Sequence, residues 1–252
     1  MNEEFVQLAQ YLKSRTGKRP FHYLPHLEGN WGDALIAYGS LKFLNEFGIP
    51  YRIRRQSKLD WLLPILTGGT AIYGASGAWC QFYDYPAHFV RRLSRFFPMI
   101  VMPSTYQSHY SIPRTTFFSR DRYESLQSMP ESTFCHDMAF FIGDEFKTSD
   151  PGSGVGYFFR TDAESAAKIK LPSNNWDISA AGNNNSNVPK FFEHIAKYSV
   201  IYTDRLHVSI AACLLGREVH LYPGAYFKNK SIFRSSIEGN FPNAHFHEEF
   251  DF

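Results

Sequence analysis

The chain has 252 residues, which is enough for one large domain or two small ones, each with a buried core. Hydrophobic residues make up 44% of the chain and charged residues 20%, as in globular proteins, and a net charge of +2 gives no field that favours nucleic acid. The acidic N-terminus and the absence of an apolar run near the ~20 residues that span a bilayer predict a cytoplasmic protein.

In the first part of the chain, short apolar runs alternate with helical patterns. An opening helix is marked by Phe5, Leu8, Ala9 and Leu12. The predicted strands are residues 21–24, 51–54, 71–73, 99–102 and 115–118, and the predicted helices between them are 33–47, 59–66, 88–97 and 121–127. This alternation predicts a parallel sheet covered on both faces.

Residues 149–154, which are rich in Ser, Pro and Gly, are predicted to be a linker, and the alternation then starts again. The predicted strands are 155–159, 200–202 and 219–222, the predicted helices are 163–169, 191–198 and 206–215, and most of 172–189 is an expected loop. We therefore predict an α/β fold with two Rossmann-like domains, residues 1–149 and 150–252, whose parallel sheets face each other across a cleft.

The segment from Tyr202 to His207 runs from a buried strand through a polar turn into a helix. Arg205 and His207 therefore lie at the carboxyl end of a strand and in the first turn of a helix, where open α/β sheets bind ligands. Arginine supplies a planar fork for phosphate or carboxylate, and histidine supplies a proton near neutral pH. This pair predicts an enzyme that acts on a small anion.

A glycine-containing turn after the first strand includes Asn30, Gly32 and Asp33. Glycine lets the backbone approach a ligand, and the helix N-terminus favours an anion. Capping of the helix by Asn30 or Asp33 explains the same residues equally well.

A later strand is followed by a similar turn that contains Gly74, Gly77 and Trp79. The glycines permit close approach of a ligand, and the indole of Trp79 could stack on a sugar. A plain strand-to-helix turn is an equally good interpretation.

Three further cationic side chains follow strands and are candidates for binding an anion. Arg120 and Arg160 lie at strand ends, where the alternative is a salt bridge. Lys228 follows the last strand and can offer a point charge to phosphate, although it could also be a solvated lysine. We favour binding for Lys228 because Arg205 and His207 lie on the neighbouring junction.

Residues 88–97 combine basic and aromatic side chains at helical spacing. Such a helix can lie on an anionic membrane surface. A helix with Phe89, Leu93 and Phe96 in the core and its arginines outside is the alternative.

No metal site is predicted, because neither the histidines nor the cysteines are spaced as ligands. The three cysteines, Cys80, Cys135 and Cys213, are odd in number and widely spaced, so they indicate no disulfide framework and favour a reducing compartment. The chain has neither a GxSxG motif nor a phosphate-binding loop with lysine.

Taken in order, these motifs resemble those of the polysaccharide pyruvyl transferase family. They are residues 29–33, the glycine turn 74–77, Arg120-Asp121, residues 137–140, Arg160, residues 204–207, Tyr226 and Lys228. The chain departs from the family pattern at the glycine turn and at Asp137-Met138, where the family has a glycine triplet and Asp-Pro. It is also short for the family.

The resemblance implies a two-domain fold like that of GT-B glycosyltransferases and transfer of a pyruvyl group from phosphoenolpyruvate to two hydroxyls of a sugar. It further implies that no cofactor is needed, because phosphoenolpyruvate is the donor substrate. Arg205, Arg120, Arg160 and Lys228 are the candidates for binding phosphoenolpyruvate. His207 is the candidate general acid, and Asp33 is a candidate to orient or deprotonate the acceptor.

The resemblance places the acceptor on the first domain and phosphoenolpyruvate on the second. The expected acceptor is a glycan of an exopolysaccharide or of the cell envelope, and a lipid-linked acceptor would bring the protein to the inner face of the cell membrane through residues 88–97. One alternative is a GT-B glycosyltransferase that uses a nucleotide sugar, although the second half lacks a clear acidic-glycine nucleotide site. Another is a non-catalytic glycan-binding relative, against which the presence of both Arg205 and His207 argues.

Overall fold

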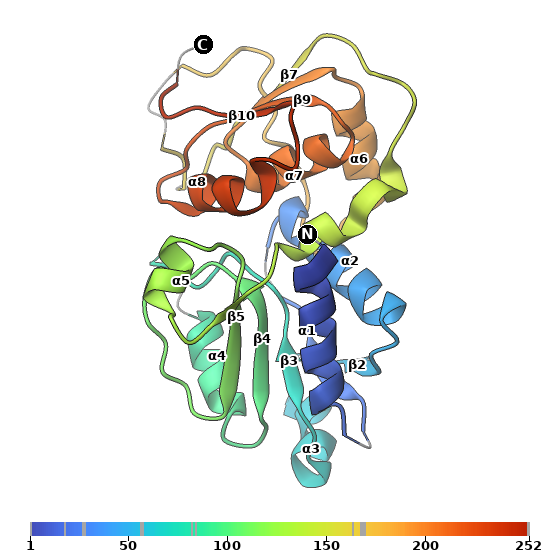
Figure 1. The fold of residues 1–252 in the computed structure, drawn as a ribbon, viewed down its shortest axis with the longest axis vertical. Helices are drawn as coiled ribbons and strands as arrows, with labels where there is room; N and C mark the ends of the chain where they lie inside the picture. The colour runs from blue at the N-terminus through green and yellow to red at the C-terminus, as the bar shows by residue number, and fades with distance from the viewer. Residues whose placement is uncertain are drawn as a thin grey trace. The chain divides into compact units, whose positions relative to one another are not determined.

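The structure is a computed structural model that describes residues 2–17, 19–26, 29–55, 58–81, 83, 85–162, 164–166 and 170–250. Its contacts divide the chain into two compact units, each with its own parallel sheet (Figure 1). The first unit is Met1–Leu27 with Gly39–Phe141, and the second is Glu28–Tyr38 with Ile142–Phe252. The expected α/β class with two parallel sheets is confirmed. The division into domains at 149/150 stays a prediction.

The first unit contains a six-stranded parallel sheet with the strand order β2-β1-β3-β4-β5-β6. Its strands are β1 (Phe21–Leu24), β2 (Tyr51–Ile53), β3 (Ala71–Tyr73), β4 (Met99–Ser104), β5 (Thr115–Ser119) and β6 (Thr133–Phe134). After β2 the chain returns past β1 to β3, so the strand order reverses between β1 and β3. In open α/β sheets, the carboxyl ends of strands at such a reversal are a preferred ligand-binding position.

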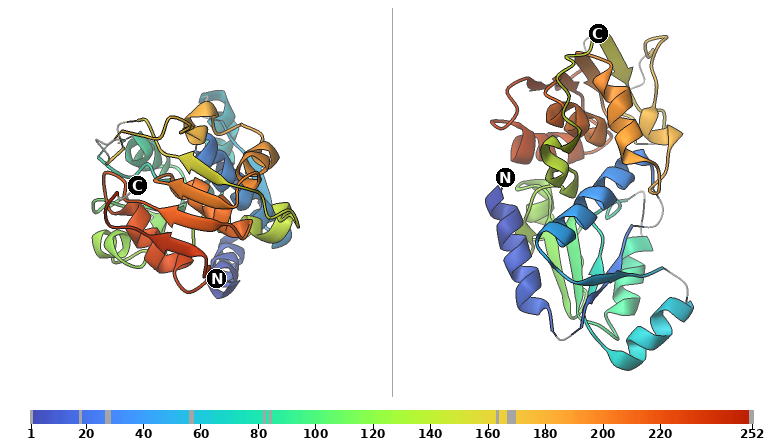
Figure 2. Two further views of the ribbon diagram at one scale, coloured as in Figure 1. Left: turned by 90° about the horizontal axis from the view of Figure 1, so that it is seen from above. Right: turned by 90° about the vertical axis from the view of Figure 1, so that its right-hand side faces the viewer.

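Helices cover both faces of the six-stranded sheet. They are α1 (Asn2–Arg15), α2 (Trp31–Glu46), α3 (Lys58–Thr67), α4 (Tyr85–Leu93) and α5 (Glu124–Ser128). Trp61 of α3 and Val90 of α4 share one buried cluster with Val101 of β4, whereas α1 contacts the other face, where the Tyr11 hydroxyl donates to Thr116. Figure 2 (right) shows α1 on one side of the strands and α3 on the other. Right-handed crossovers place α2 and α3 on opposite faces, because the connections β1–β2 and β2–β3 that contain these helices run in opposite directions across the sheet.

The second unit contains a four-stranded parallel sheet with the order β10-β9-β8-β7. Its main elements are β7 (Val155–Phe158), α6 (Val188–Ala196), β8 (Val200–Thr203), α7 (Leu206–Leu214), β9 (Glu218–Leu221), α8 (Lys228–Ile232) and β10 (Ala244–Phe246). Because the strands follow one another in sequence order, every right-handed crossover lies on the same face. The three helices accordingly lie on one side of the sheet (Figure 1).

The other face of the four-stranded sheet carries no helix in the described part of the chain (Figure 2, left). The strand register places Tyr157, Tyr202, His220 and His245 side by side across this face. Tyr202 stacks on His220 with ring centroids 4.3 Å apart. Within the described residues, helical cover on both faces is therefore found for the six-stranded sheet but not for the four-stranded one.

Most predicted elements occupy their expected place in the chain, and β1 and β3 have the predicted bounds. The helix expected over 163–169 is wrong where it is described, because residues 164–166 are not helical; residues 163 and 167–169 lie outside the described residues. Residues 27 and 28 of the first glycine turn also lie outside them. Four short helices have no predicted counterpart: η1 (Met138–Phe146), η2 (Ile178–Ala181), α8 and η3 (Phe233–Ile237). The two short strands β6 and β10 were likewise not expected.

Residues 88–97 fit neither interpretation of the sequence completely. The helix ends at Leu93, which is buried, and Phe89 is partly buried against the same core. Phe96, by contrast, is 48% exposed, beside the exposed Arg95.

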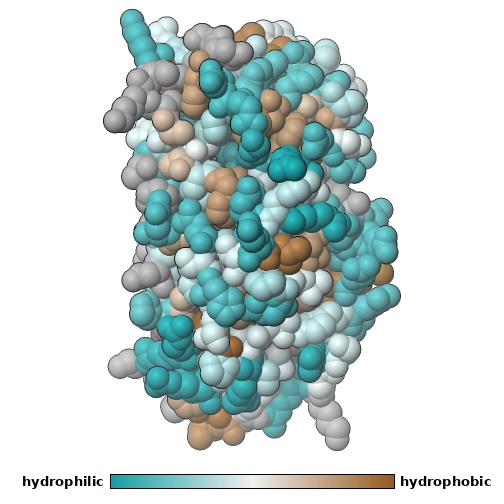
Figure 3. Space-filling model, turned by 60° about the vertical axis from the view of Figure 1, so that its left-hand side comes forward, coloured by the Kyte–Doolittle hydropathy of each residue, from teal (hydrophilic) through white to brown (hydrophobic). Residues whose placement is uncertain are grey.

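On the face drawn in Figure 3, apolar residues are scattered among hydrophilic ones. Among the described helices, none is both long and apolar enough to cross a membrane.

Candidate functional site

Arg205 lies between β8 and α7 as the N-cap residue of that helix, and hydrogen bonds hold both its backbone and its side chain. Its backbone N–H donates to Thr203 Oγ1 over 2.9 Å, and that hydroxyl donates to the carbonyl oxygen of Phe158 over 2.7 Å. The guanidinium forms a bidentate pair with Asp177, with Nε–Oδ1 at 2.9 Å and Nη2–Oδ2 at 2.6 Å. Asp177 also caps η2 by accepting from Ala180 N, so the carboxylate itself is held in place. The arginine that we expect to bind an anion is therefore already paired with a carboxylate.

Asp162 joins Arg205 to a second predicted residue, Arg160, which follows β7. The Asp162 carboxylate accepts from Arg160 Nε at 2.8 Å and from Arg160 Nη2 at 3.2 Å. The oxygen that faces Arg160 Nη2 also lies 2.8 Å from Arg205 Nη2. The two guanidiniums are nearly buried, whereas the Asp162 side chain is 44% exposed.

Glu164 brings Lys228 into the same network. One carboxylate oxygen of Glu164 lies 2.9 Å from Arg160 Nη1 and 2.6 Å from Lys228 Nζ. Lys228 is the first residue of α8, and its ammonium group lies 5.0 Å from the ring centre of Tyr226. Three of the four cations predicted to bind phosphoenolpyruvate thus lie together, although they come from three separate segments of the second unit.

The network contains as many carboxylates as cations. Burial alone would raise the pKa of Glu164, but the charges of Lys228 and Arg160 outweigh burial and lower this pKa to about 2. The pKa of Asp162 is lowered in the same way, because Arg160 and Arg205 outweigh the effect of burial. Both groups are therefore ionised at neutral pH. Without rearrangement, these six side chains offer no excess positive charge to an anion.

Asp204 adds a seventh titratable group behind the network. It is fully buried, and its Oδ1 accepts from Arg160 N over 2.7 Å. Within the described residues, nothing donates to its other carboxylate oxygen. Burial raises the pKa of Asp204 to about 6, despite the nearby charges of Arg160 and Arg205.

The N-terminus of α2 belongs to the second unit and carries a reciprocal cap. The Asn30 side chain accepts from Gly32 N at 2.7 Å, and the Asp33 carboxylate accepts from Asn30 N at 2.9 Å. The capping interpretation therefore holds for both side chains. A role of Asp33 towards the acceptor stays a prediction, since one of its oxygens already serves the cap.

Gly32 also allows α2 to approach His207 closely. A Cβ atom at Gly32 would lie 2.5 Å from His207 Nδ1 and 2.9 Å from Asn30 Oδ1, so only glycine fits this position. The neighbouring Trp31 anchors the helix, because its Nε1 donates to the carbonyl oxygen of Asn187 at the start of α6. The first glycine turn and the Arg205–His207 segment, far apart in the sequence, are thus brought together in one unit.

Arg120 does not share this environment. It lies in the first unit with its side chain 1% exposed, and Nη1 is 2.6 Å from Asp137 Oδ2 while Nε donates to Thr105 at 2.7 Å. A guanidinium enclosed in this way holds the ends of strands together. The structure therefore supports the salt-bridge interpretation of Arg120, although the pair is buried rather than at the surface, and it gives no support to an anion clamp.

Trp79 is likewise in the core of the first unit, 1% exposed. Its ring packs edge-on against Tyr73, Tyr106 and Phe117, with centroids 5.7 to 6.0 Å away. This burial argues against the expected stacking on a sugar. Gly74 and Gly77 follow β3 as predicted, and whether they bind a ligand stays a prediction.

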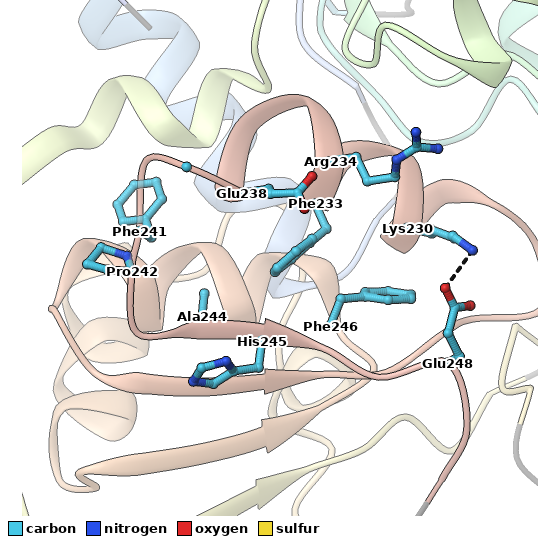
Figure 4. Close-up of a pocket in the computed structure, with 11 residues that line it drawn as sticks. Lys230, Phe233, Arg234, Glu238, Phe241, Pro242, Ala244, His245, Phe246 and Glu248 are labelled. Carbon is cyan, nitrogen blue, oxygen red and sulfur yellow. Dashed lines mark ion pairs between the residues drawn. The ribbon is translucent and has the colours of Figure 1, made fainter.

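A pocket of about 540 Å³ lies beside β10 in the second unit (Figure 4). Its wall includes Phe233 and Phe246, and the ion pair of Lys230 with Glu248 lies at one end. None of the residues that line it is among the predicted site residues.

Comparison with known proteins identifies the family. The family model for polysaccharide pyruvyl transferase matches residues 30–223, more than half of the chain. The chain belongs to this family. A search of curated proteins found no match. The fold is similar to the crystal structure of a functionally uncharacterised protein from Klebsiella pneumoniae subsp. pneumoniae NTUH-K2044, with a TM-score of 0.81 and 25% sequence identity over 99% of this chain and 100% of the other.

The region matched by the pyruvyl transferase model begins at Asn30, in the cap of α2, and ends before Lys228. It therefore contains both turns that meet at Gly32 and His207. It also contains Asp162, Glu164 and Asp177, the three acidic residues of the network, none of which the sequence patterns indicated. Asp162 could have been suspected from its position two residues after Arg160, whereas Asp177 lies in an Asn- and Ser-rich loop that carries no local signal of its partner.

A second group missed from the sequence lies where the strand order of the first unit reverses. His26 follows β1, Tyr73 ends β3 and Tyr85 begins α4, and His26 Nδ1 lies 3.3 Å from the Tyr73 hydroxyl and 3.2 Å from the Tyr85 hydroxyl. A Cβ atom at Gly74 would lie 3.1 Å from His26 N, so this glycine permits the close approach of the two strand ends. The signal available in the sequence was a histidine, His26, two residues after the end of the first predicted strand.

The raised pKa of Asp204 predicts a specific pH dependence of stability. In the unfolded chain its pKa is near 3.8, so between about pH 4 and pH 6 the folded state retains a proton that the unfolded state has lost. The contribution of Asp204 is therefore greatest below pH 4 and is lost as the pH rises to about 6. We expect Asp204→Asn to be more stable than the wild type at pH 7 by roughly 1–3 kcal/mol, and this difference to shrink towards pH 4.

Urea unfolding at pH 4, 5 and 7, followed by circular dichroism, measures this difference. Asp144→Asn is the matched control, because its carboxylate is 80% exposed in the same unit. A stability difference for Asp204→Asn that does not change with pH would show that the buried carboxyl is ionised throughout.

Proposed function

We propose that this member of the polysaccharide pyruvyl transferase family uses phosphoenolpyruvate as its donor and forms a pyruvate ketal on two hydroxyls of a sugar in an exopolysaccharide or cell-envelope glycan. The proposal includes a GT-B-like arrangement of the two domains, with the acceptor bound by the first and phosphoenolpyruvate by the second. No cofactor takes part in the proposed reaction.

One observation carries the proposal: His207, Arg205 and the N-terminus of α2 meet in the same unit. His207 lies against Gly32, and Arg205, two residues earlier, is joined through Asp162 to Arg160. A proton donor therefore lies near cations that can bind a phosphate or a carboxylate, and phosphoenolpyruvate carries both groups.

The chemistry requires an acid and a base. Proton transfer from His207 to the methylene carbon of phosphoenolpyruvate would create an electron-poor carbon, and a sugar hydroxyl would add to it while losing its own proton. The carbon–oxygen bond to phosphate would then break, and a second hydroxyl would add and lose its proton to close the ketal. Inorganic phosphate leaves, so its release reports the reaction.

We expect His207→Gln to lose about 10²–10⁴-fold in turnover while still binding phosphoenolpyruvate, because the variant removes the proton donor but leaves the cations in place. The assay combines the enzyme with phosphoenolpyruvate and candidate glycans, and follows phosphate release together with the ketal methyl signal by NMR. Binding of phosphoenolpyruvate is measured separately by calorimetry.

The matched control is His194→Gln, which replaces a histidine of α6 in the same unit. Near-normal turnover of His207→Gln would remove His207 from the proposed role. Turnover of a nucleotide sugar by the wild type, with no phosphate released from phosphoenolpyruvate on any glycan, would instead favour a GT-B glycosyltransferase. Glycan binding without any turnover would favour a non-catalytic relative.

For the acceptor, we propose that the sugar binds at the carboxyl ends of β1 and β3, beside His26. A tyrosine hydroxyl both donates and accepts, so when His26 Nδ1–H donates to Tyr85, Nε2 keeps a lone pair that can take a proton from a sugar hydroxyl. Two observations support this position: the reversal of strand order between β1 and β3, and the presence of a nearly buried histidine there. Asp33 is the other proposed residue for this step.

We expect His26→Gln to lower turnover by on the order of 10²-fold and to leave the affinity for phosphoenolpyruvate unchanged, because His26 and the cation network belong to different units. Steady-state kinetics with calorimetry tests this. His109→Gln, at an exposed histidine of the first unit, is the control. If His26→Gln has normal turnover and Asp33→Asn does not, Asp33 rather than His26 takes the proton from the sugar hydroxyl.

A lipid-linked acceptor would bring the protein to a membrane, and we propose that residues 88–97 then contact the lipid. Exposed Phe96 and the exposed Arg91, Arg92 and Arg95 support this surface. We expect the protein to sediment with vesicles that contain anionic phospholipid but not with neutral vesicles. In the double variant Arg91→Glu/Arg95→Glu, we expect the affinity for anionic vesicles to fall at least tenfold. Equal binding to both kinds of vesicle, or none to either, would contradict this contact.

A further inference from the structure

We propose that Asp162 is a built-in competitor for the anion site of the second unit: its carboxylate occupies the place of the ligand's anionic group between Arg160 and Arg205, and the ligand binds by displacing it. This inference rests on the proposed function only in taking the Arg160–Arg205 pair as the place where a phosphate or carboxylate binds.

The geometry of Asp162 is that of a bound anion. Its two oxygens face Nε and Nη2 of Arg160 at 2.8 and 3.2 Å, the side-on arrangement in which guanidinium binds carboxylate and phosphate. The second oxygen also lies 2.8 Å from Arg205 Nη2 and so bridges both arginines. A ligand that used both guanidiniums would need the same donors.

The charge balance requires that one carboxylate give way. Arg160, Arg205 and Lys228 are opposed by Asp162, Glu164 and Asp177, and the lowered pKa values of Asp162 and Glu164 keep both of these groups ionised at neutral pH. Adding a phosphate and a carboxylate beside three ionised carboxylates would be repulsive, because both guanidiniums and the carboxylates of Glu164 and Asp177 are nearly buried and water screens their charges little. Displacing one carboxylate restores an excess of positive charge.

Asp162 is the group best suited to leave. Its side chain is 44% exposed, whereas those of Glu164 and Asp177 are 10% and 7% exposed. Once rotated into water, its carboxylate can be hydrated, and the desolvation cost that would follow for a buried carboxylate does not arise. Asp177 also accepts from Thr161 and caps η2, so its movement would disturb the surrounding loop.

After the Asp162 side chain has turned away, the remaining ion pairs hold both arginines in place. Arg205 keeps its bidentate pair with Asp177, and Arg160 keeps its contact with Glu164. The consequence is selectivity, because weakly binding anions such as chloride must compete with an internal carboxylate, while a ligand with two anionic groups gains enough to displace it. Return of Asp162 would also favour release of the product phosphate.

The test measures binding of inorganic phosphate by isothermal titration calorimetry to the full-length chain. We expect Asp162→Asn to bind phosphate about tenfold more tightly than the wild type, because asparagine keeps the size of the side chain without its charge. We expect Asp144→Asn, which removes an exposed carboxylate of the same unit, to bind as the wild type does. We expect Asp177→Asn to bind more weakly, because Arg205 loses its buried partner.

In kinetics with phosphoenolpyruvate, phosphate should become a stronger product inhibitor of Asp162→Asn, by a similar factor. Thermal unfolding confirms that each variant is folded, and Asp162→Ser provides a second substitution with the same expected direction. Unchanged or weaker phosphate binding in folded Asp162→Asn and Asp162→Ser would overturn the proposal, since it would show that Asp162 does not compete for the arginines.

The proposed transfer reaction and the proposed competition by Asp162 can each be disproved without the other. If no glycan supports release of phosphate from phosphoenolpyruvate, the proposed function falls, whereas tighter phosphate binding by Asp162→Asn would still establish the competition. If transfer occurs but Asp162→Asn binds phosphate no more tightly, only the role of Asp162 is lost.

Discussion

A guanidinium that is almost fully buried needs a counter-charge, and this need organises the second unit. Arg205 and Arg160 lie at the carboxyl ends of neighbouring parallel strands, where the polar turn after each strand meets the same edge of the sheet. Unpaired, they would cost several kcal/mol each to bury. Asp177 and Glu164 meet this need from inside the fold, and Asp162 completes the charge balance from the solvent side. Asp177 thereby joins Thr161, which follows β7, to Arg205 at the start of α7.

The same edge receives the start of α2. Asn30 and Asp33 satisfy the first backbone donors of that helix, and Gly32 leaves room for His207. Glycine is thus needed at this turn for a contact between helices and not for an unusual backbone angle. α2 begins in the second unit and continues into the first. The family match, residues 30–223, includes parts of both units.

Local patterns predicted the parts of this fold that local chemistry determines. Alternation of apolar runs with helical spacing located β1, β3 and α7, and strand ends were correctly identified as the positions of Arg160 and Arg205. Partners brought in by tertiary structure were not predictable. Arg120 and Arg205 look alike in the sequence, each beside an aspartate at the end of a strand. In the structure Arg120 pairs with the buried Asp137, whereas Arg205 pairs with Asp177 and with the partly exposed Asp162. The environment of Trp79 was not predictable for the same reason, since an aromatic residue after a glycine turn can pack in the core as readily as it can stack on a sugar.

In our proposal, a ligand anion takes the place of the Asp162 carboxylate between Arg160 and Arg205. A crystal structure of the protein with phosphoenolpyruvate tests it most directly. We expect a phosphate or carboxylate oxygen within hydrogen-bonding distance of both guanidiniums and the Asp162 side chain turned towards solvent. We also expect the pairs Arg205–Asp177 and Arg160–Glu164 to be retained. Phosphoenolpyruvate bound elsewhere in the second unit, with Asp162 still bridging the two arginines, would contradict it.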